Sequence, residues 1–165
     1  MSSTFVVPEK HLSTRALISK FLALPRFAVI GVSRNPKDFS RMMLHELLKR
    51  GYDAVPVNPA LGSEVEGRKC YASVRDITPP VSAALIMTSA EMTDKLVAEC
   101  AECDIDLVWM HRATGRGAVS DNAVAFCREH GIEVIPGECP FMFLPKNGFH
   151  AIHGFIRKLT GSYPH

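Results

Sequence analysis

The stretch that decides the fold runs from Phe27 to Met43 and reads FAVIGVSRNPKDFSRMM. The segment Arg26–Val32 is apolar on both faces, which predicts a strand in the middle of a parallel sheet. A turn of small and polar residues follows, and a helix is expected from about Ser40 to Arg50, closed by Gly51 as its C-cap. Because α/β proteins bind phosphates at such strand–turn–helix junctions, this stretch is the first candidate for a ligand site.

Apolar runs separated by helical patterns continue along the rest of the chain. Four more strands are expected at about 54–57, 81–87, 107–110 and 132–135, and helices at about 91–103, 119–130 and 148–159. Another helix, capped by Ser13 and ended by Pro25, precedes the first strand. This alternation predicts an α/β fold: a Rossmann-like, doubly wound, five-stranded parallel sheet in the order 3-2-1-4-5, with helices on both faces.

Length and composition indicate one globular domain. The chain has 165 residues, so we expect a single domain over 25–165, on which residues 1–24 pack as an N-terminal segment and helix. The net charge of +2 comes from scattered basic residues, which gives little support to nucleic-acid binding. No apolar run reaches the roughly 20 residues of a membrane span, and no export signal is recognised. Five cysteines in this context suggest reduced thiols and a cytoplasmic location.

A ligand crevice is expected beyond the carboxyl ends of the strands, where the winding of the sheet reverses. In the predicted order, this point lies between the first and fourth strands. The residues that follow the strands would line it: Gly31, Val32, Ser33, Arg34, Asn58, Pro59, Met87, Thr88, Ser89, Met110 and His111. Gly31 permits close backbone approach, and the helix that starts near Ser40 offers free N–H groups. Arg34, Lys37 and Arg41 lie within eight residues of one another and favour an anionic ligand.

The nature of the anion is narrowed by what the loop lacks. A dinucleotide cofactor normally meets a glycine triplet after the first strand and an acidic residue at the end of the second. Here the second strand ends in Asn58 and Pro59, and neither feature is present. A cation-rich loop without that acid suits a nucleotide with more phosphate than NAD. Coenzyme A fits, and NADP fits less well.

Four segments together resemble the small stand-alone CoA-binding domain proteins, a family similar in fold to the CoA-binding domain of the succinyl-CoA ligase α subunit. These are FAVIGVSRNPKDFSRMM, GYDAVPVNP at 51–59, DLVWMH at 106–111 and GIEVIPGECPFMF at 131–143, and the resemblance runs from about Pro25 to Pro164. It implies CoA contacts from Gly31, Val32, Ser33, Arg34, Lys37, Asn58, Pro59, Thr88, Met110 and His111, which Ser40 and Arg41 join as candidates. The sequence departs from the ligases in having Arg34 in place of a glycine, and in having no lysine at Ala60-Leu61.

The sequence contains no complete catalytic constellation. His111 could act as a base, but no serine or carboxylate is placed beside it by the sequence. His150-x-x-His153 could bind a metal only with further ligands from elsewhere, so no metal site is expected. Cys100 and Cys103 are expected at a helix C-terminus, where packing is favoured over redox chemistry. Cys139 follows the fifth strand and is a possible contact for the ligand's thiol.

Two hypotheses about function follow. The first is a non-catalytic protein that binds CoA or an acyl-CoA, acting in acyl-CoA metabolism as a sensor, a carrier or a partner of an acyl-CoA enzyme. The alternative is an NADP-type oxidoreductase with an atypical phosphate loop, for which no hydride-transfer residues can be named. A regulator that has lost its ligand affinity is a third interpretation.

Overall fold

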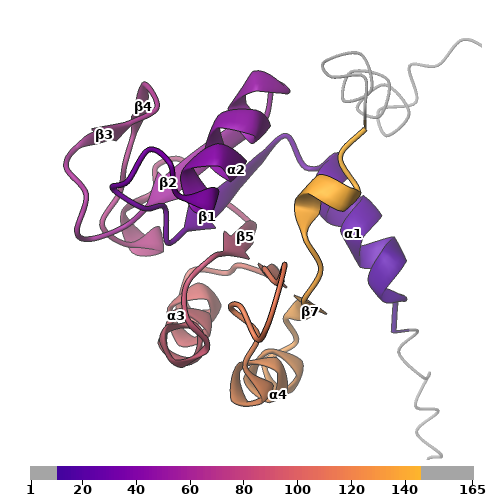
Figure 1. The fold of residues 1–165 in the computed structure, drawn as a ribbon. Coiled ribbons are helices and arrows are strands. Elements are labelled where there is room, and N and C mark those ends of the chain that lie inside the picture. The colour runs from indigo at the N-terminus through magenta and orange to yellow at the C-terminus, as the bar shows by residue number, and fades with distance from the viewer. Residues whose placement is uncertain (1–10, 146–165) are drawn as a thin grey trace, which may run out of the picture.

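Five parallel strands form the centre of the protein. The computed structural model describes residues 11–145, and Figure 1 shows the sheet in its order β2-β1-β5-β6-β7. The strands are β1 (Arg26–Ile30), β2 (Asp53–Val57), β5 (Ala83–Ile86), β6 (Leu107–Met110) and β7 (Glu133–Pro136). All four neighbouring pairs are parallel. The prediction of a doubly wound, Rossmann-like, five-stranded α/β fold is confirmed.

The order of the strands differs from the predicted 3-2-1-4-5. With these five strands numbered along the chain, the observed order is 2-1-3-4-5, so β5 lies beside β1 and not beyond β2. Both orders satisfy the right-handed crossover rule. At the outer edge of β2 the carbonyl of Pro56 accepts a bond from the N–H of Tyr71, but Pro56 has no N–H to offer a full neighbouring strand. Only an isolated bridge between Val57 and Tyr71 forms there, and the winding therefore reverses between β1 and β5.

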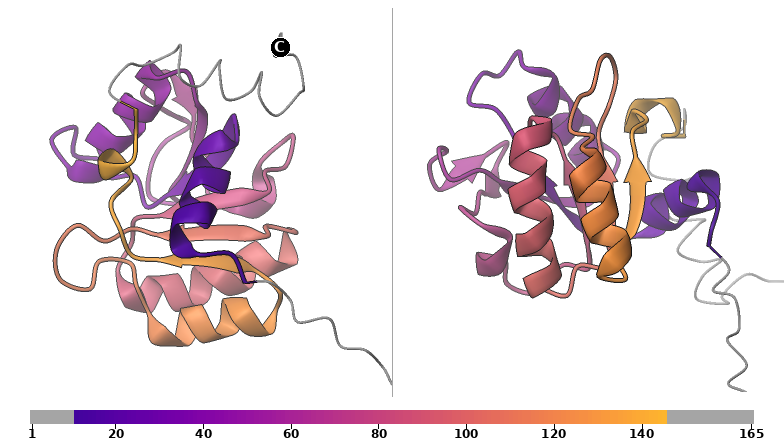
Figure 2. Two further views of the ribbon diagram at one scale, coloured as in Figure 1. Left: turned by 90° about the vertical axis from the view of Figure 1, so that its right-hand side faces the viewer. Right: turned by 90° about the horizontal axis from the view of Figure 1, so that it is seen from below.

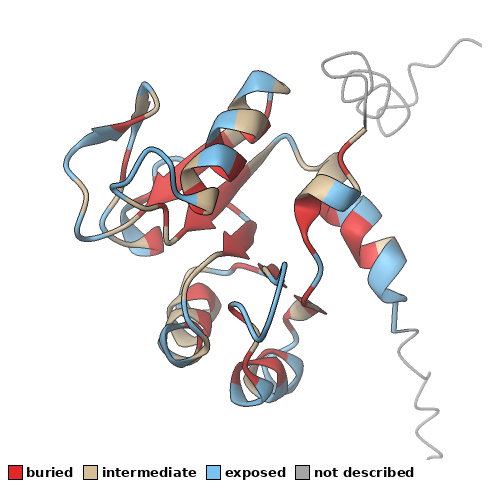
Figure 3. Cartoon of the chain, in the orientation of Figure 1, coloured by how far each residue is buried: buried red, intermediate tan, exposed pale blue. Residues whose placement is uncertain are grey.

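Helices cover both faces of the sheet, as Figures 1 and 2 show. The helices α1 (Thr14–Ala23) and α2 (Phe39–Lys49) pack on one face. On the other face lie α3 (Ala90–Glu102) and α4 (Asp121–Glu129). The strands are buried on both sides (Figure 3), and alternate residues of β1 point to opposite helix layers. This two-sided burial explains the uninterrupted apolar runs of the sequence.

The helix caps follow from short polar side chains. Ser13 accepts a hydrogen bond from the N–H of Ala16 at 3.3 Å, and Ser89 accepts one from the N–H of Met92 at 3.4 Å. At the start of α2, however, Asp38 is the N-cap, and it accepts from the N–H of Ser40 at 2.8 Å. The helix therefore begins at Phe39, and Ser40 lies inside its first turn.

The segment between β2 and β5 contains a structure that the sequence pattern does not predict. The short strands β3 (Glu64–Val65) and β4 (Arg68–Lys69) pair as an antiparallel hairpin. A short 3-10 helix, η1 (Val74–Asp76), follows the hairpin, and a second one, η2 (Pro140–Met142), follows β7. The helix predicted at 148–159 and the pair His150-x-x-His153 lie outside the described residues. Within 11–145, no helix is long and apolar enough to cross a membrane.

Candidate functional site

Gly31 brings the loop after β1 against the end of β5. Its φ of +94° lies in the left-handed region that glycine adopts most readily. A Cβ atom at this position would lie 2.6 Å from Cγ2 of Thr88 and 3.1 Å from the carbonyl carbon of Met87. The two strand ends that flank the reversal of winding therefore touch at Gly31, and no larger residue fits without movement.

Asn58 connects the loop after β1 to the loop after β2. Its side-chain amide donates to the carbonyl of Val32 at 2.8 Å, while its side-chain oxygen accepts from the N–H of Ala60 at 2.8 Å. Pro59, the next residue, is exposed. Asn58 thus holds two of the predicted ligand-binding loops in a fixed relation, whereas Pro59 lies open at the surface.

Polar groups of the loop that joins β1 to α2 bond largely to one another. The N–H of Ser33 donates to Oγ of Ser40 at 2.8 Å, and that hydroxyl donates to Asp38 at 2.5 Å. The N–H of Asn35 donates to Oγ of Ser33 at 3.1 Å, and the N–H of Lys37 donates to the Asn35 side chain at 3.0 Å. Ser40 is buried and stabilises the loop from inside. The loop is therefore held in its conformation by its own polar groups.

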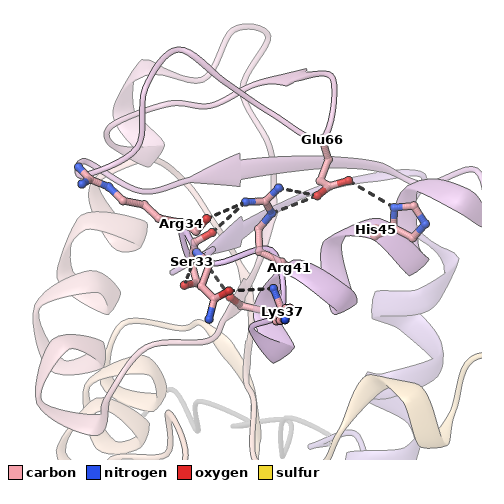
Figure 4. Close-up of polar contacts among 8 residues, drawn as sticks. Ser33, Arg34, Lys37, Arg41, His45 and Glu66 are labelled. Carbon is pink, nitrogen blue, oxygen red and sulfur yellow. Dashed lines mark hydrogen bonds and ion pairs between the residues drawn. The ribbon is translucent and has the colours of Figure 1, made fainter.

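The three cations of the loop have three different environments, as Figure 4 shows. The Arg34 side chain extends away from Arg41, and its Nε donates to the carbonyl of Ala60 at 2.7 Å. Arg41 forms an ion pair with Glu66 at 2.6 Å. Lys37 is exposed and has no ion pair with any residue of the described part of the chain. Of the three, Lys37 is the cation most available to a phosphate group.

His111 places an unpartnered nitrogen at the end of β6. Its Nε2 atom is buried and has no hydrogen-bond partner among the described residues. The ring lies 5.2 Å from the ring of Phe39, which in turn packs edge-on against Phe141 at 5.4 Å. Burial lowers the pKa of His111 below its ordinary value of 6.5, so the imidazole is neutral at neutral pH. Because an unpaired buried nitrogen is costly, this atom fits a polar group of a ligand.

Not every predicted contact presents its side chain to a ligand. Val32 and Met110 are 0% exposed, so only their backbone atoms remain for contact. The carbonyl of Met110 already accepts from the N–H of Gly137 at 3.0 Å. Thr88 is partly exposed, and its methyl group lies against Gly31 in the loop after β1. The structure therefore brings Ser33, Arg34, Lys37, Thr88 and His111 to one edge of the sheet with some exposed surface.

Cys139 lies in the turn after β7 and is 8% exposed. The turn is fixed by Trp109, whose Nε1 donates to the carbonyl of Gly137 at 2.8 Å. Burial raises the pKa of Cys100 to about 12, and Cys103 ends α3 as its C-cap. This pair is therefore packed at a helix C-terminus as predicted. The role of Cys139 as a thiol contact remains a prediction.

Two of the hollows in the surface of residues 11–145 bear on the location of the site. The larger, of about 820 Å³, is lined by residues of α1 and β7, including Leu17, Lys20 and Glu133, and lies away from the loop after β1. The other, of about 460 Å³, lies between the first turns of α3 and α4. Two of its lining residues, Ala90 and Arg112, directly follow Ser89 and His111 in the chain. The smaller hollow therefore borders the predicted crevice.

Glu66 is the residue of this region that sequence reasoning missed. Its carboxylate accepts two hydrogen bonds from Arg41 and lies 3.3 Å from Nδ1 of His45. Arg41 lowers the pKa of Glu66 below its ordinary range through these hydrogen bonds, and His45 contributes. The Glu66-Gly67 pair after Val65 is a signal for a hairpin turn, but two-residue strands are too short for a pattern to detect.

The chain belongs to the CoA binding domain family, whose model matches residues 25–145. Among curated proteins it is 29% identical over 114 residues to the uncharacterized protein YneT of Bacillus subtilis, covering 69% of this chain and 81% of the relative. This uncharacterized relative adds no activity to the family assignment.

Solved structures show the same fold. A hypothetical protein from Pyrococcus horikoshii OT3 superposes with a TM-score of 0.70 at 27% identity, over 86% of this chain and 95% of that chain. The apo dinucleotide-forming acetyl-coenzyme A synthetase 1 of Ca. Korarchaeum cryptofilum gives a TM-score of 0.60 at 22% identity, over 71% of this chain but 27% of the synthetase. At that identity the synthetase shares the fold alone.

Proposed function

We propose that the protein binds coenzyme A, or an acyl-CoA, at the carboxyl edge of its sheet. The observation that carries this proposal is the loop between β1 and α2, which is held in shape by its own hydrogen bonds and leaves Lys37 without an ion partner in the described chain. An ammonium group next to a preformed loop at a helix N-terminus suits the phosphates of CoA. Membership of the CoA binding domain family supports this choice of anion.

His111 supports the same proposal from the other side of the reversal point. A neutral imidazole can donate or accept a hydrogen bond, and its buried Nε2 lacks a partner in the described residues. The pantetheine part of CoA carries amides that can fill this role. We therefore assign the phosphates to the loop after β1 and a polar part of the pantetheine arm to the end of β6.

The proposed role is binding or regulation in acyl-CoA metabolism. The candidate donors described above are Lys37 and His111, and we infer that they recognise a ligand without transferring a group. We assign no chemical step to the protein.

Isothermal titration calorimetry with four nucleotides tests this function. CoA should bind more tightly than dephospho-CoA, because a 3′-phosphate adds charge-assisted hydrogen bonds, and more tightly than NAD. Equal affinities for CoA and dephospho-CoA would remove the 3′-phosphate from the proposal. Tighter binding of NADP than of CoA would contradict it and favour the oxidoreductase alternative. Native mass spectrometry of freshly purified protein would show any bound CoA by its mass.

A further inference from the structure

Arg41 faces the backbone of the loop after β1. Its Nη1 donates to the carbonyl of Ser33 at 3.3 Å and to the carbonyl of Arg34 at 3.2 Å. The remaining donors, Nε and Nη2, bond to Glu66 at 3.1 and 2.6 Å. The side chain is 13% exposed. Arg41 is thus engaged on both sides and has little surface left for a ligand.

These bonds fix the direction of a backbone donor. A trans peptide unit is planar, and its C=O and N–H point in opposite directions. When Arg41 holds the carbonyl of Ser33, the N–H of Arg34 is turned to the opposite side of the loop. That N–H has no acceptor among the described residues. Arg41 therefore presents an unused donor on the face of the loop that is turned away from its own guanidinium.

Glu66 holds Arg41 in this position from the hairpin. Glu66 and Gly67 form the two-residue turn between β3 and β4, and both have positive φ, +49° and +70°. Positive φ is uncommon for a residue other than glycine, so the backbone here is strained. The carboxylate of Glu66 reaches across to α2 and contacts both Arg41 and His45 (Figure 4).

We propose that Glu66 and Arg41 are positioning residues of the anion site: the β3–β4 hairpin holds the β1 loop in its binding conformation without touching the ligand. This inference rests on the proposed function. The hairpin then sets the affinity for CoA through the loop, although it lies outside the strand–turn–helix unit that contacts the phosphates.

A positioning role of Glu66 and simple electrostatics predict opposite effects of this carboxylate on CoA binding. A carboxylate near an anion repels it, so removing the negative charge should strengthen the binding of CoA. If Glu66 acts by holding Arg41, removing its charge should weaken binding, because the loop loses its fixed conformation. The sign of the change therefore distinguishes the two roles.

The test compares Glu66→Gln with Glu64→Gln in the full chain, by calorimetric titration with CoA. Glu64 lies on the same hairpin, is exposed and has no ion pair within residues 11–145, so its variant controls for the loss of charge. Glu66→Gln should weaken CoA binding about tenfold, whereas Glu64→Gln should leave it unchanged or slightly stronger. Adding Arg41→Gln to Glu66→Gln should cost less than the two single losses combined. Unchanged or tighter binding by Glu66→Gln would overturn the proposal.

A second measurement separates this inference from the proposed function. Hydrogen exchange of the N–H groups at 33–37 in the protein without CoA should be faster in Glu66→Gln than in the native chain or in Glu64→Gln. If the native chain does not bind CoA, the proposed function fails, but the exchange result still tests the bracing of the loop. Equal exchange in all three proteins would show that Glu66 does not hold the loop, and would overturn the inference whatever the affinity for CoA.

Discussion

The two sides of the candidate site are stabilised by different means. The loop after β1 is mostly exposed and is held by hydrogen bonds among Ser33, Asp38 and Ser40, with an ion pair behind it. The ends of β6 and β7 are held by packing, with Trp109 fully buried and edge-on to Phe21 at 5.4 Å. Polar bonds fix the direction of donors, whereas packing fixes the position of buried groups. Changes in the loop should therefore affect binding, and changes at the strand ends should affect stability.

Substitution of Gly31 should change both CoA binding and folding stability, and we expect the largest effect there. Gly31→Ala places a methyl group 2.6 Å from Thr88 at a φ of +94°. Strain and overpacking together should cost about 2–4 kcal/mol of folding free energy, and CoA binding should be lost as the loop moves. Urea unfolding and calorimetry measure the two effects.

Gly62→Ala is the matched control for this substitution. No atom lies within 4 Å of a Cβ at Gly62, and its φ is not in the left-handed region. The control should unfold like the native protein and bind CoA normally. If Gly31→Ala also behaves in this way, the loop and the end of β5 are not in the close contact described.

Substitution of Lys37 should change CoA binding with almost no change in folding stability. Lys37→Ala should weaken CoA binding by roughly 1–3 kcal/mol, the usual contribution of a charged hydrogen bond. Its unfolding free energy should hardly change, because an exposed charge contributes little to folding. Lys49→Ala, at the other end of α2, is the control and should bind CoA normally. A native affinity in Lys37→Ala would place the phosphates elsewhere.

Arg34→Ala should also weaken CoA binding by roughly 1–3 kcal/mol. Its guanidinium donates to the carbonyl of Ala60, so the variant loses a link between two loops in addition to a charge. Calorimetry with CoA and dephospho-CoA measures the loss. If both Arg34→Ala and Lys37→Ala bind normally, backbone donors such as the N–H of Arg34 would have to hold the phosphates.

The pH dependence of folding stability in a His111 variant tests the side of the candidate site that is held by packing. Because burial lowers the pKa of His111 in the folded state, the unfolded state binds more protons as the pH falls below the ordinary value of 6.5. This residue should therefore lower the stability of the native protein as pH falls through that window. His111→Asn should show a smaller loss between neutral pH and about pH 5.5, measured by urea unfolding. An unchanged pH dependence would contradict the buried, neutral imidazole.

The smallest effect is expected at Cys139. If the pantetheine arm extends past His111, CoA disulfide should exchange with this thiol, forming a mixed disulfide and releasing one CoA thiol. Cys103 is more exposed than Cys139, but it lies at the C-terminal end of α3, whereas the first turn of α3 borders the predicted crevice. Peptide mapping after brief exposure should find Cys139 modified first, with Cys139→Ser as control. Faster modification of Cys103 would mean that exposure decides and that the arm does not reach this turn.

Much of the fold could be predicted from the sequence because the apolar runs are long and are buried on both faces. The β6 strand has the predicted bounds, and Ser13 and Ser89 cap the predicted helices. The strand order could not be predicted, since both doubly wound orders obey the same handedness rule. Pro56, which has no N–H for a further neighbour, is a sequence signal of an edge strand, but it also fits a strand with one relaxed neighbour, and the single bridge of Tyr71 to β2 leaves no pattern in the sequence.

The sequence indicates which residues lie in the loop after β1, but it does not indicate their contacts. Arg41 and Ser40 lie in that loop, and the structure shows them bonded to the loop and to the hairpin. A cation that binds a ligand and one that braces a loop look the same in sequence. The partner that distinguishes them, Glu66, lies 25 residues further along the chain, and only folding brings the two together.

Hydrogen–deuterium exchange of the full chain with and without CoA tests the central claim most directly. The account predicts that CoA slows exchange at 31–38 and at 110–112, on the two sides of the reversal point between β1 and β5. The backbone N–H groups of the residues that line the hollow between α1 and β7 should exchange at the same rate in both samples. Protection confined to α1 and β7, or no protection at 31–38 at a concentration of CoA that saturates the protein, would contradict a CoA site at the carboxyl edge of the sheet.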